Sequence, residues 1–139
     1  MTRRFLSSSL LLVSLAFAGV AQAGPLPAAA KAVLDETVNM LVDGKADEWI
    51  EKHCDPNKCR DQIDKDRFKQ YAIKSATQHG GACLHGEKKE TQVERVRGEP
   101  ASGVKFMVYV NCTGRQMPPP VGMRWEPESK RYVVNSLSL

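Results

Sequence analysis

The stretch 104–112, Val-Lys-Phe-Met-Val-Tyr-Val-Asn-Cys, decides how this chain folds. Side chains alternate between the two faces of an extended strand, so every second residue shares a face. One face is then wholly apolar, because it carries Val104, Phe106, Val108, Val110 and Cys112. β-branched and aromatic residues favour strands, and Gly103 and Gly114 bracket the run. The pattern predicts a central strand whose apolar face receives helices from the N-terminal half.

Three helices are predicted before this strand. Apolar residues recur at three- and four-residue spacing over 28–43 and 46–53, and Gly44 separates the two helices because it adopts positive φ without strain. The third helix is predicted to begin at an N-cap, Asp64, with Ile63 and Phe68 as a hydrophobic staple, and to stop at residues 80–81. Its predicted inner stripe is Phe68, Tyr71, Ala72, Ser75, Ala76 and His79.

The second half of the chain changes to period two. Strands are predicted over 82–85, 90–97, 121–126 and 131–137, around the central stretch. The imperfect alternation of 90–97 indicates an edge, a bulge or substantial exposure. Helices followed by hairpin-linked strands predict an α+β fold with the helices packed on one face of the sheet.

The first 23 residues have the three-part layout of a secretory signal peptide. Arg3 and Arg4 precede an apolar run, and Ala21-Gln22-Ala23 is a small-residue cleavage site. The run is shorter than the roughly 20 residues that span a bilayer, so we expect cleavage and no membrane span in the mature chain. Residues 24–139 then form a single domain that is exported to the periplasm or secreted.

Charge and cysteine content limit the class of protein. Cleavage removes two of the 20 basic residues and none of the 16 acidic ones, which leaves a net charge of +2 and argues against a nucleic-acid partner. All four cysteines lie in the mature part, and three pairings are possible. Since an exported chain favours disulfides, we expect Cys54–Cys59 around a turn-forming tetrapeptide, and Cys83–Cys112.

The order of elements resembles the NTF2-like superfamily, also called SnoaL-like or cystatin-like. The resemblance covers about residues 28–139 and rests on element order, on Trp49-Ile50 in the second helix and on the terminal hairpins. It implies three N-terminal helices packed on a curved, mostly antiparallel sheet of four to five strands that forms a cone. The superfamily includes isomerases, dehydratases, small-ligand binders and partner-binding modules, so the resemblance implies no single activity.

Two kinds of binding surface are predicted. A cone pocket would be lined by Trp49, Tyr71, His79, Met107 and Tyr109. A partner contact would use the stiff loop and the basic sheet face, namely Arg115, Pro118, Pro119, Pro120 and Arg124, because a preformed polyproline segment loses little entropy on binding.

Neither a metal, a cofactor nor a catalytic set is predicted. His79, Cys83 and His85 have a spacing that suits zinc or a thiolate nucleophile, but a disulfide at Cys83 is preferred in an exported chain. We therefore expect an exported, non-catalytic module that recognises a protein partner or small ligand, for example an inhibitor or immunity-type protein. The alternative is a small cone-pocket enzyme of the isomerase or dehydratase type.

Overall fold

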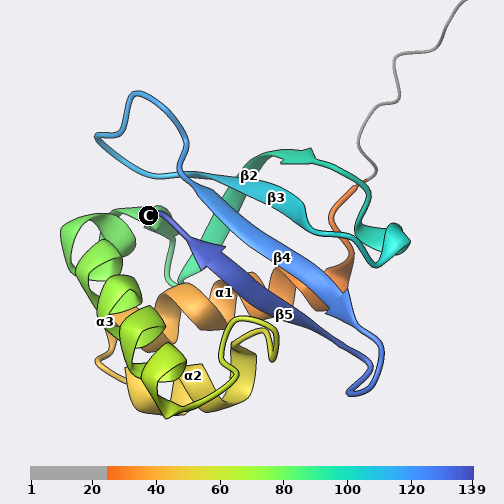
Figure 1. The fold of residues 1–139 in the computed structure, drawn as a ribbon. Helices are drawn as coiled ribbons and strands as arrows, with labels where there is room; N and C mark the ends of the chain where they lie inside the picture. Colours follow the sequence, from red (N-terminus) through yellow and green to blue (C-terminus); the bar gives the residue numbers. More distant parts are fainter. Residues whose placement is uncertain (1–24) are drawn as a thin grey trace, which may run out of the picture.

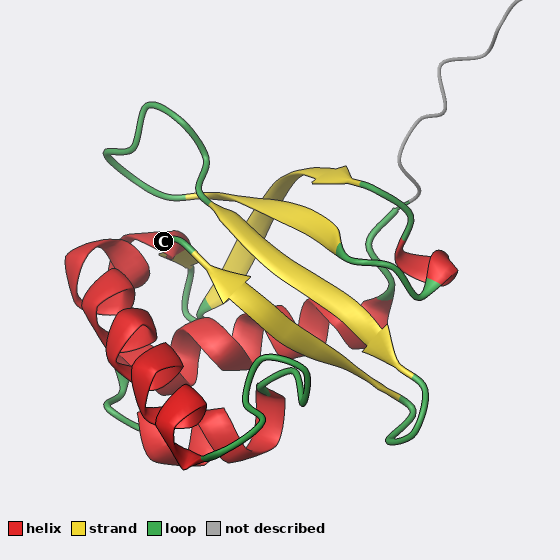
Figure 2. Cartoon of the chain, viewed as in Figure 1, coloured by secondary structure: helices red, strands yellow, loops and turns green. Residues whose placement is uncertain are grey.

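The structure is a computed structural model that describes residues 25–139, so the predicted signal peptide lies outside the described residues. Three helices pack against a five-stranded antiparallel sheet in which the strands follow chain order, β1-β2-β3-β4-β5 (Figures 1 and 2). The sheet is strongly curled, with α1 lying across its inner face. The predicted α+β class and the order of helices before strands are confirmed.

The first two helices follow the predicted pattern. α1 spans Ala28–Val42 and α2 spans Ala46–His53, and Gly44 between them has φ +76°. The apolar stripe of α1 is buried, and the indole of Trp49 on α2 is fully buried. Its Nε1 donates to Thr37 Oγ1 at 3.0 Å, so the polar atom of this large side chain is satisfied inside the core.

The start of α3, Gln62–His79, differs from the prediction. The N-cap is Asp61, whose Oδ1 accepts the backbone N–H of Asp64 at 2.8 Å, so the helix begins earlier than predicted. The predicted staple is wrong because Ile63 now lies inside the helix, 68% exposed. Tyr71 is 53% exposed and is not part of the inner stripe, which holds Phe68. As predicted, helix α3 ends at the glycines, with Gly80 as its C-cap, and the chain continues as a 3₁₀-helix, η1, over Gly80–Cys83.

The five strands are β1 Leu84–His85, β2 Glu90–Arg97, β3 Phe106–Asn111, β4 Pro120–Glu126 and β5 Arg131–Leu137. β3 is central, paired with β2 and β4. The β2–β3 register shifts between Val93 and Arg95, which confirms the predicted irregularity of β2. A second shift lies between β4 and β5, where Gly122 pairs with Ser136 but Met123 pairs with Val134.

The core lies between the inner face of the sheet and the helices. Phe106, Val108 and Val110 have no exposed surface, as their alternation predicts, and each contributes about 1.5–3 kcal/mol on burial. Val104 departs from the pattern, because it precedes β3 and is 66% exposed. Asp35 connects α1 to β2, since its Oδ1 accepts from the backbone N–H of Thr91 at 2.8 Å and from its hydroxyl at 2.5 Å.

Both predicted disulfides are confirmed. Cys54 is bonded to Cys59, and Cys83 to Cys112. Two disulfides indicate an oxidising, extracellular environment. Among residues 25–139, none of the helices has the length and apolar composition needed to cross a membrane.

We expect the two disulfides to contribute unequally to stability. They enclose sequence separations of 29 and 5 residues, and loop-closure entropy then gives about 3.5 kcal/mol for the longer loop and about 2 kcal/mol for the shorter. Urea unfolding without reductant should therefore show a larger loss of unfolding free energy in the double variant Cys83→Ala, Cys112→Ala than in the double variant Cys54→Ala, Cys59→Ala. Equal losses would contradict this ranking.

Candidate ligand-binding groove

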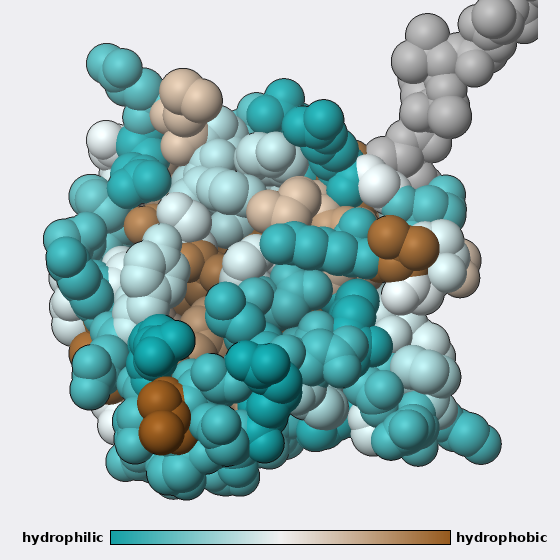
Figure 3. Space-filling model, viewed as in Figure 1, coloured by the Kyte–Doolittle hydropathy of each residue, from teal (hydrophilic) through white to brown (hydrophobic). Residues whose placement is uncertain are grey.

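A groove of about 660 Å³ opens between α3 and the sheet. Its walls are Asn57 and Lys58 of the loop closed by Cys54–Cys59, Arg60 just after that loop, and four residues of α3, namely Asp64, Arg67, Phe68 and Tyr71. Residues 135–138 in and after β5, and Met107 and Pro120 of the neighbouring strands, complete them. Figure 3 shows apolar surface recessed in this hollow and hydrophilic surface around it. The volume lies in the range of small-molecule sites in proteins.

The groove exists because α3 packs mainly on α1, α2 and η1 and not on the sheet. Two contacts hold it beside β5. At one end the loop meets the strand, where Asp55 N donates to Val134 O at 2.9 Å. At the other end Leu139 N donates to Ser75 Oγ at 2.7 Å. α3 and β5 therefore run side by side with a gap between them.

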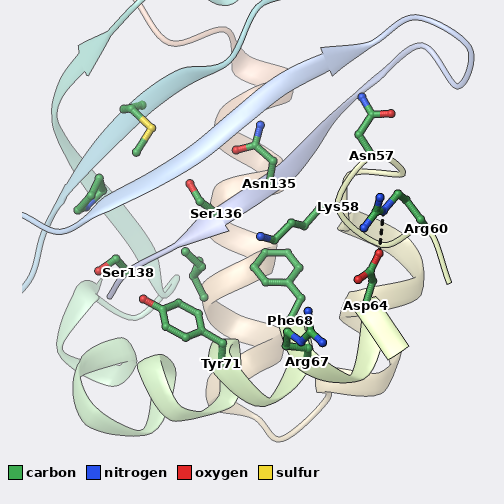
Figure 4. A pocket seen from close by; sticks show the side chains of 13 residues that line it. Asn57, Lys58, Arg60, Asp64, Arg67, Phe68, Tyr71, Asn135, Ser136 and Ser138 are labelled. Carbon is green, nitrogen blue, oxygen red and sulfur yellow. Dashed lines mark hydrogen bonds and ion pairs between the residues drawn. The ribbon is translucent and has the colours of Figure 1, made fainter. Parts of the chain in front are cut away.

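The two ends of the groove differ in chemistry. Lys58, Arg60 and Arg67 lie toward the end that carries the disulfide loop, whereas Tyr71 and Ser138 lie toward the other end (Figure 4). Leu137 and Pro120 belong to the same end as Ser138, because Ser138 N donates to Pro120 O at 3.1 Å. The groove is thus cationic at one end and mostly apolar at the other.

The cationic end has more positive charge than its ion pairs neutralise. Arg60 Nε lies 2.8 Å from Asp64 Oδ2, and this exposed pair accounts for the one carboxylate among the described lining residues. Lys58 and Arg67 form no ion pair within residues 25–139. The Lys58 ammonium lies 5.7 Å from the centroid of the Phe68 ring and extends over it toward β5 (Figure 4).

The register shift in β5 shapes the wall of the groove. Asn135 is the extra residue of the bulge, so Asn135 and Ser136 both lie over Gly122. A Cβ at Gly122 would lie 2.1 Å from Ser136 Oγ, 2.6 Å from Asn135 Oδ1 and 2.8 Å from Lys105 Cε, which means that these neighbouring side chains fill the place of an absent one. Both oxygens are buried without a hydrogen-bond partner among the described residues, at a cost of about 1–3 kcal/mol each.

A buried ion pair fastens the disulfide loop to the sheet. Arg124 Nε lies 2.6 Å from Asp55 Oδ2, and Nη2 lies 2.5 Å from Oδ1, a bidentate arrangement. Burial alone would raise the pKa of the Asp55 carboxyl. The hydrogen bond from Arg124, the backbone N–H of Asn57, the Arg124 charge and the Asn135 amide outweigh burial and hold this pKa below its usual value.

The residues of the predicted cone pocket are only partly brought together. Tyr71 and Met107 line the groove. Trp49 is enclosed in the core, His79 lies half-buried at the end of α3, and Tyr109 lies on the outer face of β3 with the Arg95 guanidinium carbon 4.1 Å from its ring centroid. The space enclosed by the curled sheet is filled with side chains instead.

The residues of the predicted partner contact are likewise not gathered on one surface. Pro119 is buried, and its carbonyl accepts from Val110 N at 3.0 Å, while Arg115 and Pro118 lie half-buried in the preceding loop. Pro120 lines the groove, and Arg124 is committed to Asp55.

The alternative roles considered for the histidine–cysteine cluster, a zinc ligand or a nucleophile, do not fit the observed bonding. Cys83 is in a disulfide, so it supplies no thiolate beside His79 and His85. Over the described part of the chain, no three His, Cys, Asp or Glu side chains are grouped closely enough to hold a metal ion.

Most residues of the groove were not identified as site residues from the sequence, among them Lys58, Arg67, Asn135 and Ser136. For Lys58 the sequence offered one indication of its position, because the residue lies between two cysteines that hold it in a short loop. The presence of both Asn135 and Ser136 in the groove depends on the β-bulge. Strand alternation in a single sequence places consecutive residues on opposite faces of the sheet, so it could not predict this pair.

Comparison with protein-family models, with curated proteins and with solved structures found no match to this chain. The similarity to the NTF2-like superfamily therefore stays a prediction.

The Asp55–Arg124 pair gives a prediction for the pH dependence of stability. Because the Asp55 pKa is lower in the folded state, its contribution is complete above the unfolded pKa, about 3.9, and is lost as the pH falls through the folded value. Asp55→Asn should lower the free energy of unfolding at pH 7 by about 3 kcal/mol, since it leaves the largely buried Arg124 guanidinium with only the more distant Glu126 carboxylate, 3.8 Å away.

Urea unfolding between pH 2 and pH 7 would measure both effects, and the variant should lose less stability on acidification than the parent. Asp47→Asn is the matched control, because its ion pair with Lys69 is exposed and should contribute no more than about 0.5 kcal/mol. A parallel acid dependence in parent and Asp55→Asn would contradict the prediction.

Proposed function

We propose that this chain is an exported, non-catalytic binding module whose recognition site is the groove between α3 and β5. The observation that carries the proposal is the groove itself, which combines a drug-sized volume and recessed apolar surface with unpaired cations at one end. Such a combination recognises a ligand by burial of apolar area and orients it by charge.

The interior of the fold supports binding over cone-pocket catalysis. The largest fully buried side chains include Trp49, Phe106 and Leu34, and they occupy the space that a cone enzyme would use for its substrate. General acid–base catalysis needs a titratable group within hydrogen-bond reach of the substrate. In the groove, Asp64 is hydrogen-bonded to Arg60, and the remaining charged groups are cations.

Export is the second part of the proposal. The two disulfides favour an oxidising compartment, and the N-terminal layout of the sequence is that of a signal peptide for the periplasm or beyond. A single disulfide-bonded domain that binds a protein partner or small ligand there would suit an inhibitor or immunity-type role. Kinship with the NTF2-like superfamily is compatible with this role, because that superfamily also includes ligand-binding and partner-binding modules.

Protein-observed NMR tests the binding site directly. The mature chain, residues 24–139, is screened with small fragments in equal numbers of anionic, neutral and cationic members. We expect the binders to shift backbone amides of the groove, above all those of Tyr71, Met107 and Ser136, and to leave the far ends of α1 and β2 unchanged.

A groove-filling variant provides the control for that screen. Ser138→Trp places an indole at the apolar end, while Thr77→Trp places the same group on an exposed position of α3 outside the groove. Binding should be lost in Ser138→Trp and kept in Thr77→Trp. If no fragment shifts the groove amides, or if the shifts map elsewhere, the groove is not the recognition site.

A further inference from the structure

The groove's two ends constrain the chemistry of its ligand. Lys58 and Arg67 are at one end, and Tyr71 and Ser138 are at the other. Pro120 lies beside Ser138, whose N–H its carbonyl accepts. A ligand that satisfies both ends must carry its charge at one end only. This step rests on the proposed function, because it takes the groove to be the binding site.

The sign of the ligand's charge follows from the ion-pair balance. Asp64 is already paired with Arg60, whereas Lys58 and Arg67 have no acidic partner within the described residues. An anion is therefore favoured and a cation is repelled.

The position of one cation is well defined. Cys54–Cys59 closes the loop that carries Lys58, and Lys58 N donates to Asp55 O at 2.8 Å. Asp55 in turn is fixed by Arg124 on β4. The cation is thus presented from a restrained backbone, which reduces the entropy lost when an anion binds.

The apolar end selects a hydrocarbon body. Tyr71 leaves about half of its surface exposed on the wall of the groove, and the half-buried Met107 and Pro120 supply further apolar surface above the buried Leu137. Each CH₂ group buried there should strengthen binding about three- to fourfold. The volume of about 660 Å³ suits a small molecule.

We propose that the groove binds an apolar monocarboxylic acid, with the carboxylate at Lys58 and Arg67 and the hydrocarbon body along Tyr71, Met107 and Pro120. The cations pair with the carboxylate, and an Arg guanidinium donates two parallel hydrogen bonds to such a head group. The Phe68 ring, over which the Lys58 ammonium extends, lies where head and body join.

Isothermal titration calorimetry on residues 24–139 tests this assignment with decanoate, decanol and decyltrimethylammonium, all kept below their micelle concentrations. Decanoate should bind more tightly than decanol, and decyltrimethylammonium should not bind in the same range. Hexanoate and octanoate complete a series in which two added CH₂ groups raise the affinity about tenfold. Added salt should weaken the binding of decanoate but not of decanol.

Variants separate the head-group contact from the fold. Lys58→Gln and Arg67→Gln should each weaken decanoate binding at least tenfold while leaving decanol binding unchanged, because each removes a charged contact to the carboxylate. Lys74→Gln is the matched control, since Lys74 is exposed on α3 and lies outside the groove. Circular dichroism confirms folding, and Tyr71→Ala should weaken both ligands.

The outcomes distinguish this inference from the proposed function. Decanol binding as tightly as decanoate, with no effect of Lys58→Gln, would overturn the acid assignment and leave the groove as a binding site. Groove shifts caused by an acidic peptide in place of decanoate would also overturn it, and would make the occupant a protein segment. If neither these probes nor any fragment shifts the groove amides, both proposals fail.

Discussion

Burial of one face of β3 is the constraint on which the rest of the structure depends. Phe106, Val108 and Val110 are inaccessible to water because α1 and its neighbours cover that face, and β3 is the middle strand of the sheet. The opposite face, which carries Met107, must then remain at the surface. With the inner face occupied, α3 packs on the other helices and only reaches the edge of β5. The groove is thus a result of the way in which the core is filled.

The sequence was sufficient where local chemistry decides the outcome. The bounds of α2, β2 and β5, the central position of β3 and both disulfides could be predicted because periodicity and spacing carry that information. The start of α3 was wrong because Asp61 and Asp64 are both good caps, and the choice between them depends on tertiary packing. The groove could not be predicted, because it joins segments 57–71 and 107–138, whose contact depends on the placement of α3.

Three polar contacts in this fold connect a helix or the disulfide loop to a strand or to the C-terminus. Asp35 fixes α1 to the hydroxyl and backbone of Thr91, and Asp55 fixes the disulfide loop to Arg124. Ser75 accepts the N–H of Leu139 at the far end of α3. Each contact joins segments that are distant in sequence. Two of the three lie at the ends of the groove, so they fix the position of its walls.

Gly122 has no charged or aromatic side chain, yet the absence of a side chain there affects how much space the groove offers. Its hydrogen leaves room for two neighbouring side chains on a strand with one residue too many. An alanine there would compete with Asn135 and Ser136 for the same space and would press them outward, into the hollow. We therefore expect related chains whose grooves differ in size to vary at positions 135 and 136 together. Position 122 should remain glycine in all of them.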